Sequence, residues 1–227
     1  MSAACLCLFM IPLLSTAYAY ARDGTLQESP GRKRILLFNS VEFKGSLRAL
    51  TKWNRILSEA EKQVVELNTC DPSSGRCPPG AMSWKALLAK AGQMTGLEQL
   101  KYVSMYINRW PYRLDIDVYG VSDYWATPQE FLKLSGDCED YCITKYFVLK
   151  ELGYDAGRVR IVIIRDRIRN ITHAALAVYL DQAVYIMDNL TDAVFEQAKY
   201  KHYIPQYSFN EMNRWAHISL RKPLPGG

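Results

Sequence analysis

A cysteine lies among acidic residues where a helix is predicted to begin, in the stretch "LSGDCEDYCITKYFVLKELG". The thiolate is the reactive form of cysteine, and three neighbouring carboxylates, those of Asp137, Glu139 and Asp140, disfavour it. The helix N-terminus acts in the opposite sense, because its dipole and free amides stabilise a thiolate, and the amide of Cys138 can donate to an oxyanion. Either Cys138 is inert, or something offsets the three charges.

A histidine and an aspartate flank the turn of a predicted hairpin. His173 opens the apolar strand in "NITHAALAVYL", and Asp188 closes the next one in "VYIMDNL". If the chain turns at Asp181–Gln182, Leu180 faces Ala183 and Asp188 is the diagonal neighbour of His173. A loop two residues longer places His173 and Asp188 directly opposite each other. Both registers put the two side chains on one face of the sheet, within reach of each other.

Together these residues predict acyl transfer through a thioester. Cys138 would be the nucleophile, His173 its base and Asp188 the group that orients the imidazole. Each residue type taken alone is more often structural, and the joint placement is what favours catalysis. Three other residues of these types have no such partners and are predicted to be structural: Cys142, His202 and His217.

The elements that must position these residues change in character along the chain. Apolar spacing predicts a helix over 46–68 with Ser46 as N-cap, then helices in "MSWKALLAKAG" and "TGLEQLKYVSMYINRW". Thr127 and the following proline predict a short helix in "TPQEFLKLSG", and a central helix runs from about Asp137 to Leu152. Gly153 follows as its C′ residue.

Beyond Val159 the runs "VRIVII", "AALAVYL" and "VYIMDNL" predict antiparallel strands. The chain is therefore expected to be an α+β protein, with a helical lobe over about 35–153 and a sheet lobe over about 154–220. The loop 112–127 is long and aromatic, and its surroundings contribute three residues that either line a substrate groove or pack in the core: Trp110, Tyr124 and Trp125.

The composition and the N-terminal segment indicate which classes of partner are unsuited to the chain and in which cellular compartment it is expected. With 227 residues, 22% of them charged, and a formal net charge of +5, the chain suits one globular domain, and no Lys/Arg stripe indicates nucleic acid. The apolar run "ACLCLFMIPLL" followed by "AYAYA" predicts a signal peptide over 1–21, with 22–227 as a single domain. An uncleaved anchor is the alternative.

Export changes the interpretation of the remaining cysteines. Cys70 and Cys77, in "NTCDPSSGRCPPG", either close a small loop as a disulfide or are two free thiols. Cys138 and Cys142 lie four apart on one predicted helix, which is a poor geometry for a bridge. These two are therefore expected to be unpaired.

The segment "DYWATPQEFLKLSGDCEDYCITKYFVLKELGY", with "HAALAVYL" and "MDNL", resembles the bacterial transglutaminase-like cysteine proteinases of the LapG type. The resemblance implies a papain-like fold in its transglutaminase-like form, with Cys138, His173 and Asp188 as catalytic residues. It also implies a bound Ca²⁺ whose ligands are the flanking acids: Asp137, Glu139 and Asp140.

Calcium would answer the opening question, because it binds closely spaced carboxylates. The alternative is that the acids only complement the helix dipole. Further ligands are expected from the preceding loop, where Asp115, Asp117 and Asp123 are candidates.

The resemblance further implies a periplasmic enzyme that cuts the N-terminal region of a large surface adhesin and so promotes biofilm dispersal. Its implied inhibitor is the periplasmic domain of an inner-membrane cyclic-di-GMP receptor. Two alternatives remain open: a transglutaminase that uses the same triad, and an inert binding module. The three triad residues are all present, which disfavours the module.

Overall fold

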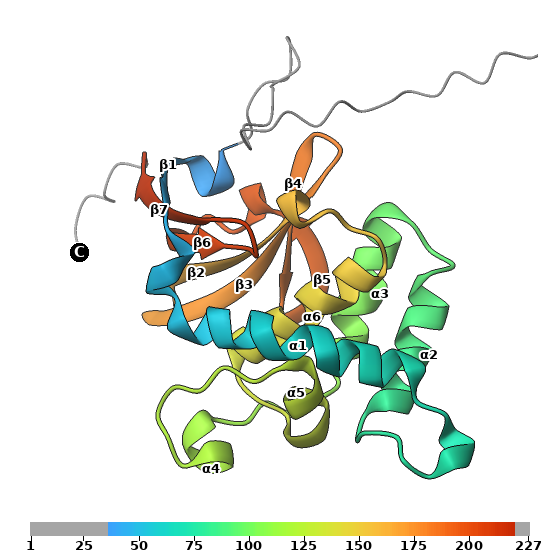
Figure 1. Cartoon of the computed structure of the whole chain (residues 1–227). Helices are drawn as coiled ribbons and strands as arrows, with labels where there is room; N and C mark the ends of the chain where they lie inside the picture. The colour runs from blue at the N-terminus through green and yellow to red at the C-terminus, as the bar shows by residue number, and fades with distance from the viewer. Residues whose placement is uncertain (1–35, 221–227) are drawn as a thin grey trace, which may run out of the picture. The chain divides into compact units, whose positions relative to one another are not determined.

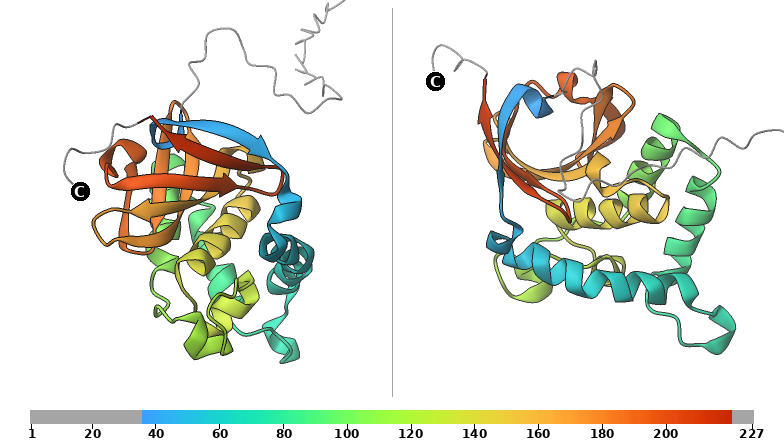
Figure 2. Two further views of the ribbon diagram at one scale, coloured as in Figure 1. Left: turned by 90° about the vertical axis from the view of Figure 1, so that its left-hand side faces the viewer. Right: turned by 45° about the horizontal axis from the view of Figure 1, so that its top comes forward.

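In the part of the chain that the structure describes, the α-helices lie to one side of a curved antiparallel sheet (Figures 1 and 2). The computed structural model describes residues 36–220, and the predicted signal peptide lies outside that range. In the described residues the α-helices are α1 (Thr51–Thr69), α2 (Ala81–Ala91), α3 (Gly96–Ile107), α4 (Asp115–Tyr119), α5 (Pro128–Leu134) and α6 (Cys138–Glu151). The strands are β1 (Ser40–Gly45), β2 (Val159–Asp166), β3 (Ile171–Leu180), β4 (Ala183–Asp188), β5 (Thr191–Glu196), β6 (Tyr203–Phe209) and β7 (Arg214–Ser219).

The sheet has seven strands, of which the apolar runs of the sequence predicted three, and one of the other four lies outside the predicted sheet lobe. The strand order is β1-β7-β6-β2-β3-β4-β5, and β1 pairs with β7, with Ser40 opposite Ser219. The segment 40–45, predicted to lie in a helical lobe, therefore belongs to the sheet. A single strand whose partner is far along the chain leaves little local signal. The predicted α+β class is confirmed.

The first long helix begins later than predicted. Ser46 does act as a cap, but of a 3₁₀ turn over Leu47–Ala49, where its side chain accepts a hydrogen bond from the amide of Arg48. Leu50 then adopts a non-helical backbone (φ −103°, ψ 69°), and α1 starts at Thr51. The apolar spacing was continuous across this break, so only the backbone distinguishes the two elements.

Helix α6 is the centre of the molecule and carries Cys138 at its first position. Every residue from Asp140 to Leu149 is buried, because the helix packs against β3, β2 and β4 on one side and against α3 and α5 on others. The predicted stripe through Cys142 is thus part of a fully enclosed helix. Gly153 ends it with φ +88°, a conformation that glycine adopts without steric cost.

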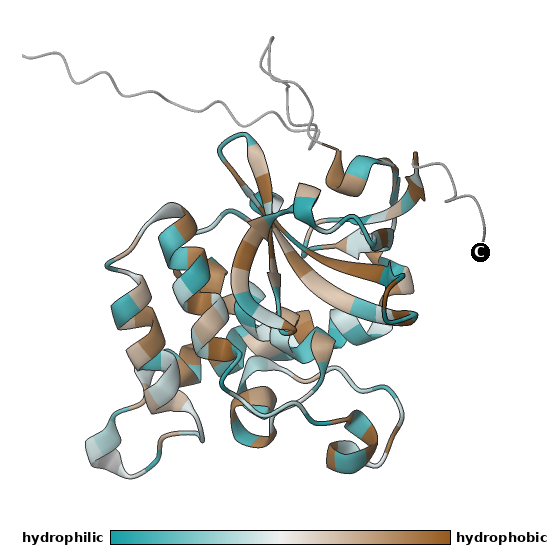
Figure 3. Cartoon of the chain, turned by 180° about the vertical axis from the view of Figure 1, so that it is seen from behind, coloured by the Kyte–Doolittle hydropathy of each residue, from teal (hydrophilic) through white to brown (hydrophobic). Residues whose placement is uncertain are grey.

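Both faces of the central strands are buried, which explains their unbroken apolar runs. One face packs on the helices through residues such as Ile161 and Leu176, and the other meets Leu37, Phe38 and Tyr203. In Figure 3 the strands carry long hydrophobic stretches, whereas hydrophobic and hydrophilic residues alternate along the helices. Among the described residues no helix is both long enough and apolar enough to cross a membrane.

A disulfide joins Cys70, which follows α1, to Cys77, which precedes α2. The two Cα atoms are 5.1 Å apart, a usual separation for a bridge. Of the two alternatives that the sequence left open for Cys70 and Cys77, the structure has the disulfide. Cys138 and Cys142 are free thiols, as predicted.

Candidate active site and acidic cluster

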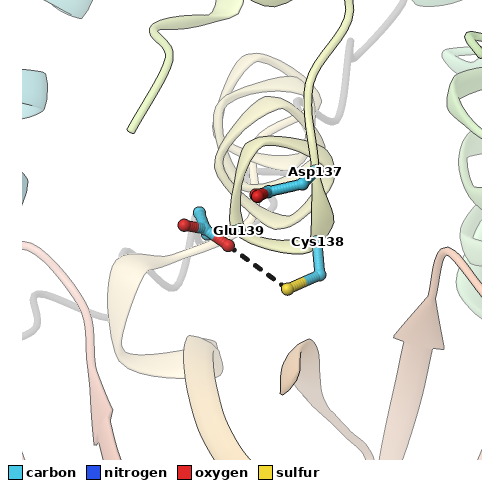
Figure 4. A group of neighbouring side chains, drawn as sticks. All are labelled: Asp137, Cys138 and Glu139. Atoms are coloured by element: carbon cyan, nitrogen blue, oxygen red, sulfur yellow. Dashed lines mark hydrogen bonds between the residues drawn. The ribbon is translucent and has the colours of Figure 1, made fainter. Parts of the chain in front are cut away.

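Cys138 is the first residue of α6, and its side chain projects away from the helix (Figure 4). The thiol donates a hydrogen bond to Oε2 of Glu139 at 3.2 Å, and the nearby backbone of Ala174 on β3 acts to lower the pKa of the thiol. The Cys138 amide has no acceptor within the helix, as for the first N–H groups of any helix. The thiol therefore lies at a helix N-terminus, beside the residue that follows His173.

His173 and Asp188 form a buried hydrogen-bonded pair. The β3–β4 hairpin pairs Leu180 with Ala183, which is the shorter of the two predicted registers. His173 Nε2 lies 2.9 Å from Asp188 Oδ1, and the two side chains are 3% and 0% exposed. Because Nε2 is engaged by the carboxylate, Nδ1 is the ring nitrogen left for another partner.

The carboxylate of Asp188 is fully supplied with donors. Oδ1 also accepts from the amide of Leu190 at 2.9 Å, and Oδ2 accepts from the Tyr203 hydroxyl at 2.7 Å. Burial by itself raises the pKa of Asp188, but the hydrogen bond and charge of His173, with these donors, outweigh burial and hold the pKa below its usual range. Asp188 is thus an anion that fixes the Nε2–H tautomer of His173.

Five carboxylates converge beside Cys138. Oxygens of Asp115, Asp137 and Asp140 lie within 4.8 Å of one another, and so do those of Asp115, Asp123 and Glu139. The three predicted flanking ligands are therefore joined by two acids of the preceding loop. Asp117, the third candidate from that loop, is exposed on α4 and belongs to neither group.

Two of these carboxylates each have one oxygen that the protein leaves without a hydrogen-bond partner. Asp115 Oδ1 and Asp137 Oδ1 are buried and have no hydrogen-bond partner. Burial raises the pKa of Asp137 to about 9, with the hydrogen bond and charge of Glu139 adding to the effect. Burial likewise raises the pKa values of Asp115, Glu139 and Asp140.

Such a set of oxygens fits a hard cation. Calcium takes six to eight oxygen ligands, often from several carboxylates, and the two unpartnered buried oxygens are atoms that a cation would satisfy. For Cys138 the same charges act against reactivity. Burial raises the pKa of the thiol well above its usual range, and the charges of Glu139 and Asp137 raise it further.

Asp140 also holds the site together through the backbone. Its Oδ1 accepts from the amide of Ala126 at 2.6 Å, and Oδ2 accepts from the amide of Asp137 at 3.1 Å. A Cβ on Gly136 would lie 1.9 Å from Oδ2 of Asp140, so only glycine fits there. Ser135 precedes it with φ +66° and ψ −168°, a strained conformation for a residue other than glycine.

Sequence reasoning missed Tyr203, Gly136 and the backbone of Ala174. Tyr203 lies on β6, which pairs with β2 rather than with the His173 hairpin, so no local pattern links it to Asp188. The glycine directly before the helix N-cap was a usable signal, because it marks a close approach to the backbone.

The other predicted residues have structural surroundings. Trp125 is buried and stacks on Phe209 (centroids 5.4 Å apart), and Trp110 packs against Phe131. Tyr124 is half-buried, stacks on Tyr119 and donates to Glu130 at 2.7 Å.

The two remaining histidines lie outside the triad. His202 packs edge-on against Tyr203. His217 is bonded at Nδ1 to Ser40 and at Nε2 to Ser208, both at 2.7 Å.

A cysteine at a helix start, beside a strand whose histidine is hydrogen-bonded to an aspartate of the next strand, is the arrangement expected of a papain-like protease. The sequence model of the family described as "Bacterial transglutaminase-like cysteine proteinase BTLCP" matches residues 59–222. The chain belongs to this family. As a member it is a cysteine proteinase, and the matched region contains Cys138, His173 and Asp188.

Solved structures of one family member are similar to this chain. Calcium-bound LapG of Legionella pneumophila is 27% identical with a TM-score of 0.57, over 69% of this chain and 87% of that one. EGTA-treated LapG of the same organism is 26% identical with a TM-score of 0.58, over 72% and 88%. A search of curated proteins gave no match. LapG thus binds calcium, and this chain is a LapG-like proteinase.

Proposed function

We propose that this proteinase is a calcium-dependent cysteine endopeptidase of the periplasm, with Cys138, His173 and Asp188 as its triad. The observation that carries the proposal is the placement of the Cys138 thiol near the Ala174 backbone, next to His173, whose far nitrogen is held by Asp188. The position of Cys138 beside Ala174 and the His173–Asp188 hydrogen bond support a triad drawn from a helix start, a strand start and a strand end.

The tautomer of His173 determines the direction of proton transfer. With Nε2–H donated to Asp188, Nδ1 carries a lone pair that can take the Cys138 proton. The thiolate then attacks a peptide carbonyl, and the Cys138 amide donates to the resulting oxyanion. The imidazolium returns its proton to the leaving amine, and a water molecule activated by His173 hydrolyses the thioester.

The acidic cluster is the proposed calcium site. Asp115, Asp123, Asp137, Glu139 and Asp140 would hold the ion, which supplies positive charge beside the thiol and so favours the thiolate. Support comes from the two unpartnered buried oxygens and from the calcium bound by LapG.

The proposed substrate is the N-terminal region of a large surface adhesin, and the proposed inhibitor is the periplasmic domain of a cyclic-di-GMP receptor, so that cleavage promotes biofilm dispersal. The sequence resemblance supports these partners. The Cys70–Cys77 disulfide supports the periplasm, because disulfides form in oxidising compartments. N-terminal sequencing of periplasmic protein should give a start near Tyr20 or Arg22, and an intact Met1 in the cytosol would contradict export.

The test of the activity is incubation of the purified protein with a co-expressed adhesin N-terminal region, with and without EGTA. We expect cleavage only when calcium is present, and none by Cys138→Ala. A labelled primary amine in the same reaction separates the alternatives: label attached to the substrate, without cleavage, would identify a transglutaminase instead.

A further inference from the structure

Asn108, directly after α3, contacts both strands that flank the turn after Asp188. Its Nδ2 lies 3.0 Å from the carbonyl oxygen of Asp188, 3.0 Å from that of Thr191 and 3.0 Å from Oδ1 of Asp192. The three acceptors lie where β4 ends and β5 begins, on either side of the turn between the two strands. One side chain therefore ties the end of a helix to the turn that carries Asp188.

The other end of this amide meets a buried lysine. Lys145, in the middle of α6, is 1% exposed, and its Nζ donates to Asn108 Oδ1 at 2.7 Å. Lysine can only donate and carbonyl oxygens can only accept, so the two partners together fix which end of the Asn108 amide points where. Lys145 thus sets the orientation in which Nδ2 faces the turn.

Burying this ammonium group is costly. Lysine is almost never fully buried without an anionic partner, yet Lys145 hydrogen-bonds a neutral amide. Burial lowers the pKa of Lys145 to about 8, with the charges of Cys142, Asp188 and Asp192 acting in the opposite sense. Packing alone does not account for a cation here, because an apolar side chain of similar length would fill the same volume at lower cost.

We propose that Asn108 and Lys145 are positioning residues for the reaction, which hold the backbone of Asp188 so that its carboxylate orients His173. The proposal rests on the proposed catalytic role of Asp188. The chain of contacts is continuous: Lys145 fixes the Asn108 amide, Asn108 holds the Asp188 carbonyl, and the Asp188 carboxylate holds Nε2 of His173. Neither positioning residue is required to touch the substrate.

The primary variant is Asn108→Asp. It keeps the size of the side chain and an oxygen for Lys145, but it removes the Nδ2 donor that holds the turn. Lys145→Met leaves the donor in place and removes only the group that orients it, so its effect should be in the same direction and smaller. Asn108→Ala removes both functions.

The readout is the second-order rate of Cys138 alkylation by iodoacetamide in calcium-saturated full-length protein, with Cys138→Ala as the blank. This rate reports how well His173 activates the thiol and needs no protein substrate. We expect about a tenfold loss in Asn108→Asp and a shift of its pH profile towards that of a free thiol. Asn68→Ala is the control, because Asn68 likewise links helices through two side-chain bonds, to Trp84 and Glu151.

The control should lose stability but keep the wild-type alkylation rate. Wild-type alkylation in Asn108→Asp, or an equal slowing in Asn68→Ala, would overturn the positioning role. Should Asn108→Ala fail to fold, the comparison of Asn108→Asp with Lys145→Met still decides it. If the wild-type protein itself reacts no faster than a free thiol, the proposed function fails instead, so the two failures are distinguishable.

Discussion

The active site has a strand side around Asp188 and a helix side around Cys138, and the two differ in how completely the protein supplies hydrogen bonds to their carboxylates. On the strand side, Asp188 receives donors from His173, Leu190 and Tyr203, and its pKa is held low. On the helix side, Asp137 has a buried oxygen with no partner, and burial raises its pKa to about 9. The strand side is thus complete as folded, whereas the helix side lacks positive charge.

This difference assigns two separate tasks to the two sides. The strand side sets the tautomer of His173 with groups of the protein alone, so changes there should act on activity whatever the metal content. The helix side controls the charge around Cys138, so its state should depend on a cation. The first three predictions below each act on one side and have a matched control, and the fourth concerns a group outside both sides.

The largest effect is expected from the thiol itself. Cys138→Ala should lower proteolysis by about four orders of magnitude or more, as for the loss of other catalytic nucleophiles, without loss of the fold. Cys142→Ala removes a buried thiol one turn away and should keep substantial activity, with a fall in melting temperature. An active Cys138→Ala with an inactive Cys142→Ala would reverse the assignment.

The helix side should respond next most strongly. Asp115→Asn removes charge from the acidic cluster and should weaken calcium binding, so that activity at limiting calcium falls at least about tenfold. Asp117→Asn changes an exposed acid of the same helix that lies outside the cluster, and it should behave as wild type. Equal effects of the two variants, measured as activity against free calcium, would disprove the assignment of ligands.

The strand side offers a finer change. Tyr203→Phe removes the donor to Asp188 Oδ2 and should cost about 1 kcal/mol of unfolding free energy, with activity reduced several-fold at every calcium concentration. Tyr200→Phe is the matched control, because its ring stacks on Tyr203 but its hydroxyl is buried without a partner. A loss of activity in Tyr200→Phe as large as in Tyr203→Phe would show that packing, rather than the hydrogen bond, matters.

The smallest effect on activity should come from His217, which lies outside both sides. Ser40 donates its hydroxyl hydrogen to the Leu37 carbonyl, so it accepts from His217 Nδ1, and Nε2 accepts from Ser208. Burial lowers the pKa of His217 to about 4. The unfolded chain therefore takes up this proton first as the pH falls.

This contribution to stability is complete above about pH 6.5 and is lost as the pH falls towards 4, by up to about 3 kcal/mol. His217→Asn should have a lower free energy of unfolding at pH 7. Its free energy of unfolding, measured with urea, should also change less between about pH 6.5 and pH 4 than that of the wild type. Activity at pH 7 should change little. An unchanged pH slope would mean that His217 is not the group that titrates.

Local sequence rules predicted the strand side well. The sequence left two hairpin registers open, but both placed Asp188 on the same face of the sheet as His173, and the structure has the register with the shorter turn after Leu180. The Thr127 cap and the start of α6 follow from equally local signals. A contact that depends only on residues close together in the sequence can be predicted from the local sequence pattern.

The helix side depended on distant geometry and was predicted less completely. Asp115, Asp117 and Asp123 were equivalent in the sequence, and only the short helix α4 turns Asp117 away from the cluster. The sheet also has contacts of this kind: Tyr203 reaches Asp188 from β6, which pairs with β2, and β1 pairs with β7 near the other end of the chain. Such contacts depend on tertiary packing, and no short-range pattern in a single sequence indicates them.

The most direct test of the central claim is calorimetric titration of EGTA-treated protein with calcium, with proteolysis measured on the same samples. We predict one calcium per chain, bound more weakly by Asp115→Asn and with unchanged affinity by Asp117→Asn, with activity returning in step with binding. At calcium one hundred times the Kd, stability should rise by about 2.7 kcal/mol. Full activity in excess EGTA, or no calcium binding by the wild-type protein, would contradict the claim that calcium supplies the positive charge missing on the helix side.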